Sequence, residues 1–104
     1  MNDRIAKLQA FLSQSPDDSF LIHALALEHI KLGNEEEAKT LFERNRTDRP
    51  AYVATYYHLA KLLERLGKTD DAIAVYEEGM QQAKAAGDNH SYSELQSAYE
   101  DLVY

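Results

Sequence analysis

The sequence is that of a short acidic chain without cysteine. Its 104 residues have a mass of 11.8 kDa, which is the size of one domain. The 11 Lys and Arg and 18 Asp and Glu give a formal net charge of −7. The lack of Cys excludes disulfides and thiolate metal ligands, and the acidic balance disfavours nucleic acid as a partner. With no long apolar run and no secretory signal, we expect a soluble, cytoplasmic chain that does not bind membranes.

Apolar residues recur three and four positions apart along the chain, and Gly or Pro separates these stretches. This spacing is typical of helices that bury one face, and no stretch alternates with period two for long enough to predict a strand. We therefore predict an all-α fold of six helices. Their expected ranges are 2–14, 19–32, 35–46, 53–66, 69–86 and 91–103.

The expected helix ends have local causes. Gly33 and Gly67 each follow the last apolar residue of a helix, where glycine can close the C-terminus in a left-handed conformation. Pro16 and Pro50 disfavour helix at the residue before them. The predicted N-terminal caps are Asn34 for the third helix, Thr69 for the fifth and a Ser91-x-x-Glu94 capping box for the sixth.

The chain also repeats with a period of 34 residues, which is the length of one helix–turn–helix unit. The period pairs Leu25 with Leu59, Ala26 with Ala60, Ala38 with Ala72, Phe42 with Tyr76 and Pro16 with Pro50. Small alanines at helix crossings, with large apolar side chains beside them, indicate close packing of the two helices in each unit.

This pattern resembles the tetratricopeptide repeat (TPR), whose motif is W-x2-L-G-x2-Y, then A-x3-F, then P. The first copy reads Ile22-x2-Leu25-Ala26-x2-His29, Ala38-x3-Phe42 and Pro50. The second reads Tyr56-x2-Leu59-Ala60-x2-Leu63 and Ala72-x3-Tyr76, with Lys84 in place of the final Pro.

The resemblance implies antiparallel helix pairs stacked as a right-handed superhelix of about two and a half repeats. We expect a single domain over residues 1–104. Its expected parts are an N-terminal half-repeat or cap helix (1–16), a first repeat (19–52), a second repeat (53–86) and a C-terminal capping helix (89–104).

In TPR proteins the first helices of successive repeats line a concave groove that binds peptides or protein segments. The resemblance therefore implies a non-catalytic protein–protein interaction module. The expected groove residues are Phe20, His23, Leu27 and Ile30 in the second helix, and Tyr57, His58, Lys61 and Arg65 in the fourth.

The second helix is apolar on both sides. Ile22, Leu25, Ala26 and Leu32 are expected to pack inward, whereas Phe20, Leu27 and Ile30 face the other way. A helix that is apolar all round is normally buried all round. The cover is a bound peptide, a second copy of the chain or local packing. The alternative function is accordingly a structural homo-oligomer, a homodimer for example, that uses the Phe20–Leu27–Ile30 patch.

Other partners and chemistries find less support. Some TPR domains clamp a C-terminal carboxylate with Lys and Asn one turn apart in a first helix, where this chain has His23 and Leu27. Lys61 and Arg65 could still attract a carboxylate, but the acidic surface favours basic or neutral partners. The spacing of the histidines predicts no metal site. We expect no cofactor and no catalytic residue.

Overall fold

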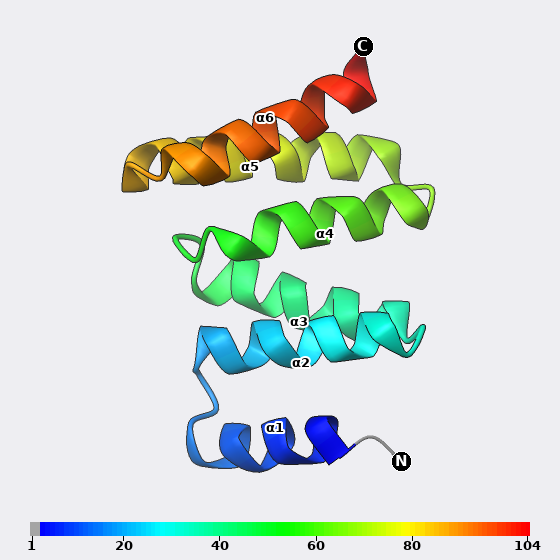
Figure 1. Cartoon of the computed structure of the whole chain (residues 1–104), viewed down its shortest axis with the longest axis vertical. Helices are drawn as coiled ribbons and strands as arrows, with labels where there is room; N and C mark the ends of the chain where they lie inside the picture. The colour runs from blue at the N-terminus through cyan, green and yellow to red at the C-terminus, as the bar shows by residue number, and fades with distance from the viewer. Residues whose placement is uncertain (1–2) are drawn as a thin grey trace. The chain divides into compact units, whose positions relative to one another are not determined.

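The computed structural model describes residues 3–104, which form six helices and no strand. Two compact units divide the chain, one ending at Arg49 and the other running from Pro50 to Tyr104. The first unit contains α1 (Asp3–Gln14), α2 (Ser19–Lys31) and α3 (Glu35–Asp48), and the second contains α4 (Ala54–Arg65), α5 (Thr69–Ala86) and α6 (Asn89–Val103) (Figure 1). The all-α prediction is confirmed, and the expected helix start at residue 2 lies outside the described residues.

In the first unit, α2 packs against both of its neighbours in the chain, α1 and α3. The α1 side is a cluster in which Leu8 meets Ala24 and Leu25, with Ile5 and Leu12 of α1 packed around it. Contacts with two neighbouring helices explain why more than one side of α2 is apolar. Packing by α1 covers the side of α2 that carries Ala24 and Leu25.

The α2–α3 pair is closely packed at the alanines of the repeat. Ala26, Ala38 and Phe42 have no exposed surface, and the Phe42 ring meets the His23 ring at a centroid distance of 5.5 Å. In the second unit α5 packs against both α4 and α6. The repeat positions that are fully buried there are Tyr56, Leu59, Ala60, Ala72 and Tyr76.

The two repeats differ at one helix crossing. In the second unit the α4–α5 approach requires glycine, because a Cβ on Gly79 would lie 2.5 Å from Cβ of Tyr56. One period earlier these positions are occupied by Ile22 and Asn45. The smaller Ile22 leaves room for the Asn45 side chain, which is buried and donates from Nδ2 to the Ser19 carbonyl at 3.0 Å. The second repeat thus pairs the large Tyr56 with Gly79, which has no side chain. The first repeat pairs Ile22 with Asn45, which are both of intermediate size.

The turn after α2 ends the helix in the way that the sequence predicts. Gly33 has a φ of 79°, and its amide donates to the Ile30 carbonyl at 3.0 Å. The next amide, of Asn34, donates to the His29 carbonyl at 2.8 Å. These two bonds form a Schellman motif, which satisfies carbonyl groups at the helix end. The same pair of bonds recurs at Gly67 and at Gly87.

Of three predicted N-terminal caps, that of α3 is right in position but its side chain does not bond the helix, and those of α5 and α6 are wrong. Asn34 stands at the cap position, but its amide contacts Nδ1 of His29 at 3.2 Å instead of an amide of α3. Thr69 is already the first residue of α5. Helix α6 begins two residues before Ser91, because Asp88 caps it by accepting from the Ser91 amide at 3.0 Å. The carboxylate of Asp88 thus takes the place of the predicted capping box.

Two further details of α2 were not anticipated. Asp18 caps this helix by accepting a hydrogen bond from the Leu21 amide at 3.1 Å. Leu32, which was expected to pack inward, is 51% exposed. The helix ends at Lys31, so Leu32 belongs to the turn and no longer follows the periodicity of the helix.

Candidate protein-interaction site

A hollow of about 120 Å³ lies between α4 and α6 in the second unit. Helix α4 buries Tyr56 and Leu59 against α5, so the residues between them, Tyr57 and His58, face away from that core and remain half-buried. From α6, Leu95 forms an apolar part of the lining. The complete lining is Val53, Ala54, Tyr57, His58, Ser91, Glu94 and Leu95.

Along the exposed side of α4, two aromatic residues are followed by charged ones. The rings of Tyr57 and His58 are edge to face, with centroids 5.6 Å apart. The Lys61 Nζ lies 5.8 Å from the Tyr57 ring centroid and 3.8 Å from Oε2 of Glu64. Glu64 also accepts a hydrogen bond from the Tyr76 hydroxyl. Burial and this bond raise the pKa of Tyr76, so the phenol stays protonated and holds the Glu64 carboxylate in place.

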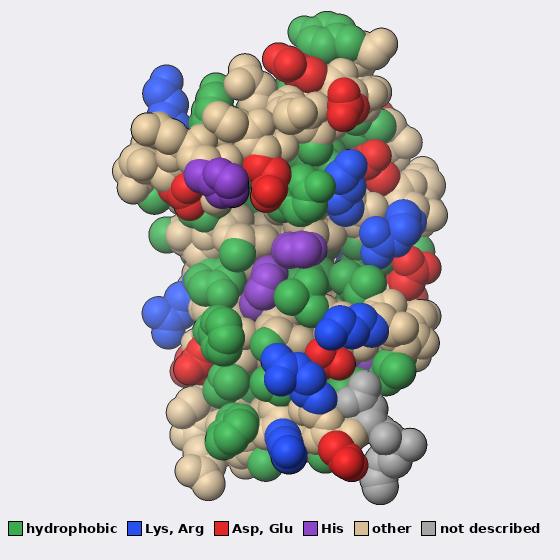
Figure 2. Space-filling view, viewed as in Figure 1, with side chains coloured by type: hydrophobic (Ala, Val, Ile, Leu, Met, Phe, Trp, Pro, Cys, Tyr) green, Lys and Arg blue, Asp and Glu red, His purple; other side chains and the backbone are tan. Residues whose placement is uncertain are grey.

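Figure 2 shows basic, acidic and histidine side chains intermixed with hydrophobic ones over the helices of the second unit. On the face in view, this mixture offers a ligand both polar and apolar contacts.

The charge of His58 is set mainly by its burial. Desolvation lowers the pKa of His58 below 6.5, the nearby Arg65 lowers this pKa further, and Glu94 acts in the opposite direction. Since a lowered pKa favours the neutral ring, His58 is uncharged at pH 7. The hollow therefore has one formal charge in its lining, the carboxylate of Glu94.

These electrostatics predict how His58 titrates. We expect its midpoint, followed by NMR of the imidazole protons, to lie below 6.5. The folded chain disfavours the charged His58 ring, whereas the unfolded chain does not. The contribution of His58 to the free energy of unfolding is therefore complete above pH 6.5 and is lost as the pH falls below 6.5. Glu94→Gln is expected to lower the midpoint further and Arg65→Gln to raise it. A midpoint at or above 6.5 in the unaltered chain would contradict this assignment.

The structure places the predicted groove residues in two groups. Tyr57, His58, Lys61 and Arg65 share the side of α4 described above, and Tyr57 and His58 line the hollow. The α2 residues of the first unit differ among themselves. Phe20 is 64% exposed, His23 is buried, and Leu27 and Ile30 are half-buried. A groove that joins the two groups stays a prediction.

The sequence reasoning missed the contribution of α6. The Ser91-x-x-Glu94 spacing predicts a capping box, but both residues line the hollow. The repeat carried a signal for Glu94. With the two-residue insertion before the last helix, position 94 is the equivalent of position 58 in the preceding copy. Residues at equivalent positions of successive first helices face the same way. The exposed position of His58 therefore predicts that Glu94 lies on the same side of the next first helix.

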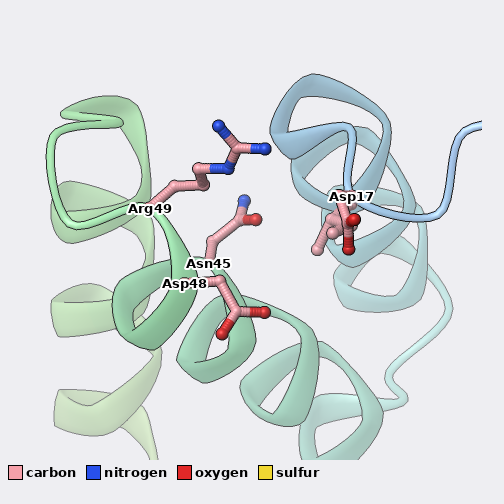
Figure 3. Close-up of a pocket in the computed structure, with 5 residues that line it drawn as sticks. Asp17, Asn45, Asp48 and Arg49 are labelled. Carbon is pink, nitrogen blue, oxygen red and sulfur yellow. The ribbon is translucent and has the colours of Figure 1, made fainter.

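A larger hollow, of about 360 Å³, lies in the first unit beside the buried Asn45. In Figure 3 the Asn45 and Arg49 side chains extend from the end of α3 toward the segment that carries Asp17. The carboxylates of Asp17 and Asp48 in this hollow already have a cationic partner. The Arg44 guanidinium lies 3.6 Å from Oδ1 of Asp17 and 3.8 Å from Oδ2 of Asp48. This neutralisation leaves little net charge to attract an ion.

Two properties of residues 3–104 bear on other functions. Residues 3–104 contain no group of three or more His, Asp or Glu side chains placed to hold a metal ion. None of the six described helices combines the length and the apolar character that crossing a lipid bilayer requires.

Helix pairs that recur every 34 residues define the chain as an all-α helical-repeat protein. A family model of the TPR type, described as anaphase-promoting complex, cyclosome, subunit 3, matches residues 4–79. A search of the curated proteins gave no significant match.

Solved structures give a closer comparison. The NMR structure of a tetratricopeptide repeat domain protein from Salinibacter ruber is 46% identical, covers 85% of this chain and 89% of its own, and has a TM-score of 0.82. A crystal structure of a tetratricopeptide repeat domain protein from the same organism is 47% identical, covers 82% and 96%, and has a TM-score of 0.79. PcrH, in complex with the chaperone binding region of PopD, shares the fold at 18% identity, with a TM-score of 0.87 over 96% of this chain and 76% of PcrH.

The chain belongs to the tetratricopeptide repeat family. Membership confirms the resemblance that the 34-residue period carried. The fold is typical of non-catalytic protein-interaction scaffolds.

Proposed function

We propose that this chain binds an extended peptide segment of a partner protein along the side of α4 that faces the hollow. The observation that carries the proposal is the hollow itself. It combines half-buried aromatic rings, an apolar floor at Leu95 and a carboxylate at Glu94. Binding sites for peptides and ligands are concave surfaces of this kind, with a few polar groups that fix orientation.

The fold is compatible with this use. PcrH has the same fold, and its structure contains the chaperone binding region of PopD. At 18% identity this likeness carries no residue roles to the present chain. The proposal therefore rests on the side chains of the second unit, and the comparison supports only the choice of a protein segment as ligand.

The alternative, self-association through the patch of Phe20, Leu27 and Ile30, has one supporting observation. Phe20 is a large aromatic side chain that is 64% exposed. The other two residues are half-buried, which reduces the apolar area that a second copy could cover. Light scattering after gel filtration distinguishes the two functions, because a chain that stays monomeric from micromolar to near-millimolar concentration does not use this patch to dimerise.

Selection from a displayed peptide library against the full chain tests the proposed function. We expect selected peptides to shift the NMR amide signals of Tyr57, His58, Lys61 and Arg65. Tyr57→Ala should weaken their binding about tenfold, because it removes a half-buried aromatic contact. The matched control is Gln81→Ala, an exposed position on α5, which should leave binding unchanged. Peptides that bind with shifts confined to other surfaces would contradict the proposed site.

A further inference from the structure

We propose that the hollow between α4 and α6 accepts one Lys or Arg side chain of the bound partner. This inference rests on the proposed function and adds the chemistry of the ligand. It assigns the carboxylate of Glu94 to the cation and the rings of Tyr57 and His58 to the sides of the site.

The charge distribution of the chain favours a cation at this place. Residues 50–104 contain nine Asp and Glu against four Lys and Arg, so the second unit has a formal charge of −5 of the total −7. Helix α6 carries Glu94, Glu100 and Asp101 but no Lys or Arg. A basic ligand is therefore attracted to this unit at long range and meets a carboxylate in the lining of the hollow.

The neighbouring rings are suited to the same ligand. Cations are attracted to the faces of aromatic side chains, and Tyr57 already has Lys61 Nζ 5.8 Å from its ring centroid. The ring of His58 is neutral because burial lowers its pKa, so it does not repel a positive charge at pH 7. An aromatic side and an acidic side together select a cation over a neutral apolar side chain.

The size of the hollow limits the ligand to the end of one side chain. Its volume is about 120 Å³, which is well below the roughly 300 Å³ at which pockets for whole small-molecule ligands begin. A guanidinium or an ammonium with its last methylenes fits this space, whereas a segment of backbone does not. Lys61 and Arg65 follow His58 by about one and two turns of α4. They therefore place positive charge beside the hollow, next to Tyr57 and His58, where an acidic residue of the partner would be favoured.

The test uses the full chain and two small probes that differ in charge but little in shape. These are N-acetyl-arginine methylamide and its neutral counterpart N-acetyl-citrulline methylamide, titrated into labelled protein at pH 7 and followed by NMR. We expect the arginine probe to cause saturable shifts at His58, Ser91, Glu94 and Leu95. The citrulline probe should bind at least fivefold more weakly.

Two variants distinguish binding in the hollow from attraction by the overall negative charge of the second unit. Glu94→Gln should weaken arginine binding at least fivefold, whereas Glu100→Gln, which removes the same charge from an exposed position of the same helix outside the lining, should change it less than twofold. Equal binding of both probes, or equal losses in both variants, overturns the proposal. Shifts spread over all acidic residues of the unit do so as well.

The outcome is distinguishable from failure of the proposed function. If selected peptides bind at the α4 side but lack Lys and Arg, the function stands and the cation site is wrong. If the arginine probe binds in the hollow but no peptide binds, the cation site stands and the peptide-binding function is wrong.

Discussion

Replacing Gly79 with alanine is expected to destabilise the second unit, although alanine is the better helix former. A Cβ at this position would lie 2.5 Å from Cβ and 2.9 Å from Cγ of Tyr56. Since one of these contacts is between two Cβ atoms, no change of rotamer relieves it, and α4 and α5 must move apart. Overpacking of about 3 kcal/mol against a gain of about 1 kcal/mol in helix propensity leaves a loss of about 2 kcal/mol. The melting temperature should fall by about 10 °C.

The control for Gly79→Ala is Ala74→Gly, at an exposed position of the same helix. It measures helix propensity alone and should cost about 1 kcal/mol. Both variants are compared with the unaltered chain by urea unfolding followed by circular dichroism. If Gly79→Ala stabilises the chain, as propensity alone predicts, the close approach of α4 and α5 at this residue is wrong.

Replacing Phe42 with alanine should have the largest effect of any single change considered. The Phe42 side chain has no exposed surface and packs against the His23 ring at 5.5 Å. Truncation of such a side chain leaves a cavity and costs about 3–5 kcal/mol. A chain of this size is stable by about 5–15 kcal/mol, so we expect a variant with a much lower urea midpoint or one that no longer folds at 37 °C.

The chain provides a matched control in Phe11→Ala, because Phe11 is 60% exposed on α1. Both substitutions remove the same atoms, yet the exposed one should change stability by no more than about 0.5 kcal/mol. A similar loss in the two variants would show that Phe42 is not the core residue that its burial indicates. The milder Phe42→Leu keeps most of the volume and provides a folded variant in which the direction of the effect can still be measured.

The helices were predictable because their signals are local. The spacing of apolar residues depends only on the pitch of a helix, and Gly33 and Gly67 mark turns that need a left-handed residue. The caps were less predictable, since several polar residues near a helix start compete for the same amides. Asp88 caps α6 before Ser91 can do so, and Asn34 contacts His29 instead of its own helix.

Of the candidate site, only the residues that α4 contributes were predictable from the sequence. The offset of Tyr57 and His58 from the buried Tyr56 and Leu59 placed them on the exposed side of α4. The local sequence around Glu94 predicts a cap and not a hollow. Its neighbour across the hollow, His58, lies 36 residues earlier in the chain. A residue's role at the end of a helix and its role in a hollow cannot be separated until the position of the opposite helix is known.

By itself the sequence determined the acidic net charge, the 34-residue period, the six helices and which face of each is apolar. All of these depend on residues within one helix or one repeat. Only the tertiary structure decided that α1 covers part of α2, that Gly79 lies against Tyr56 and that Glu94 faces the hollow beside His58. The physical reason is that periodicity tells which side chains avoid water, whereas contacts between separate helices decide which surface buries them.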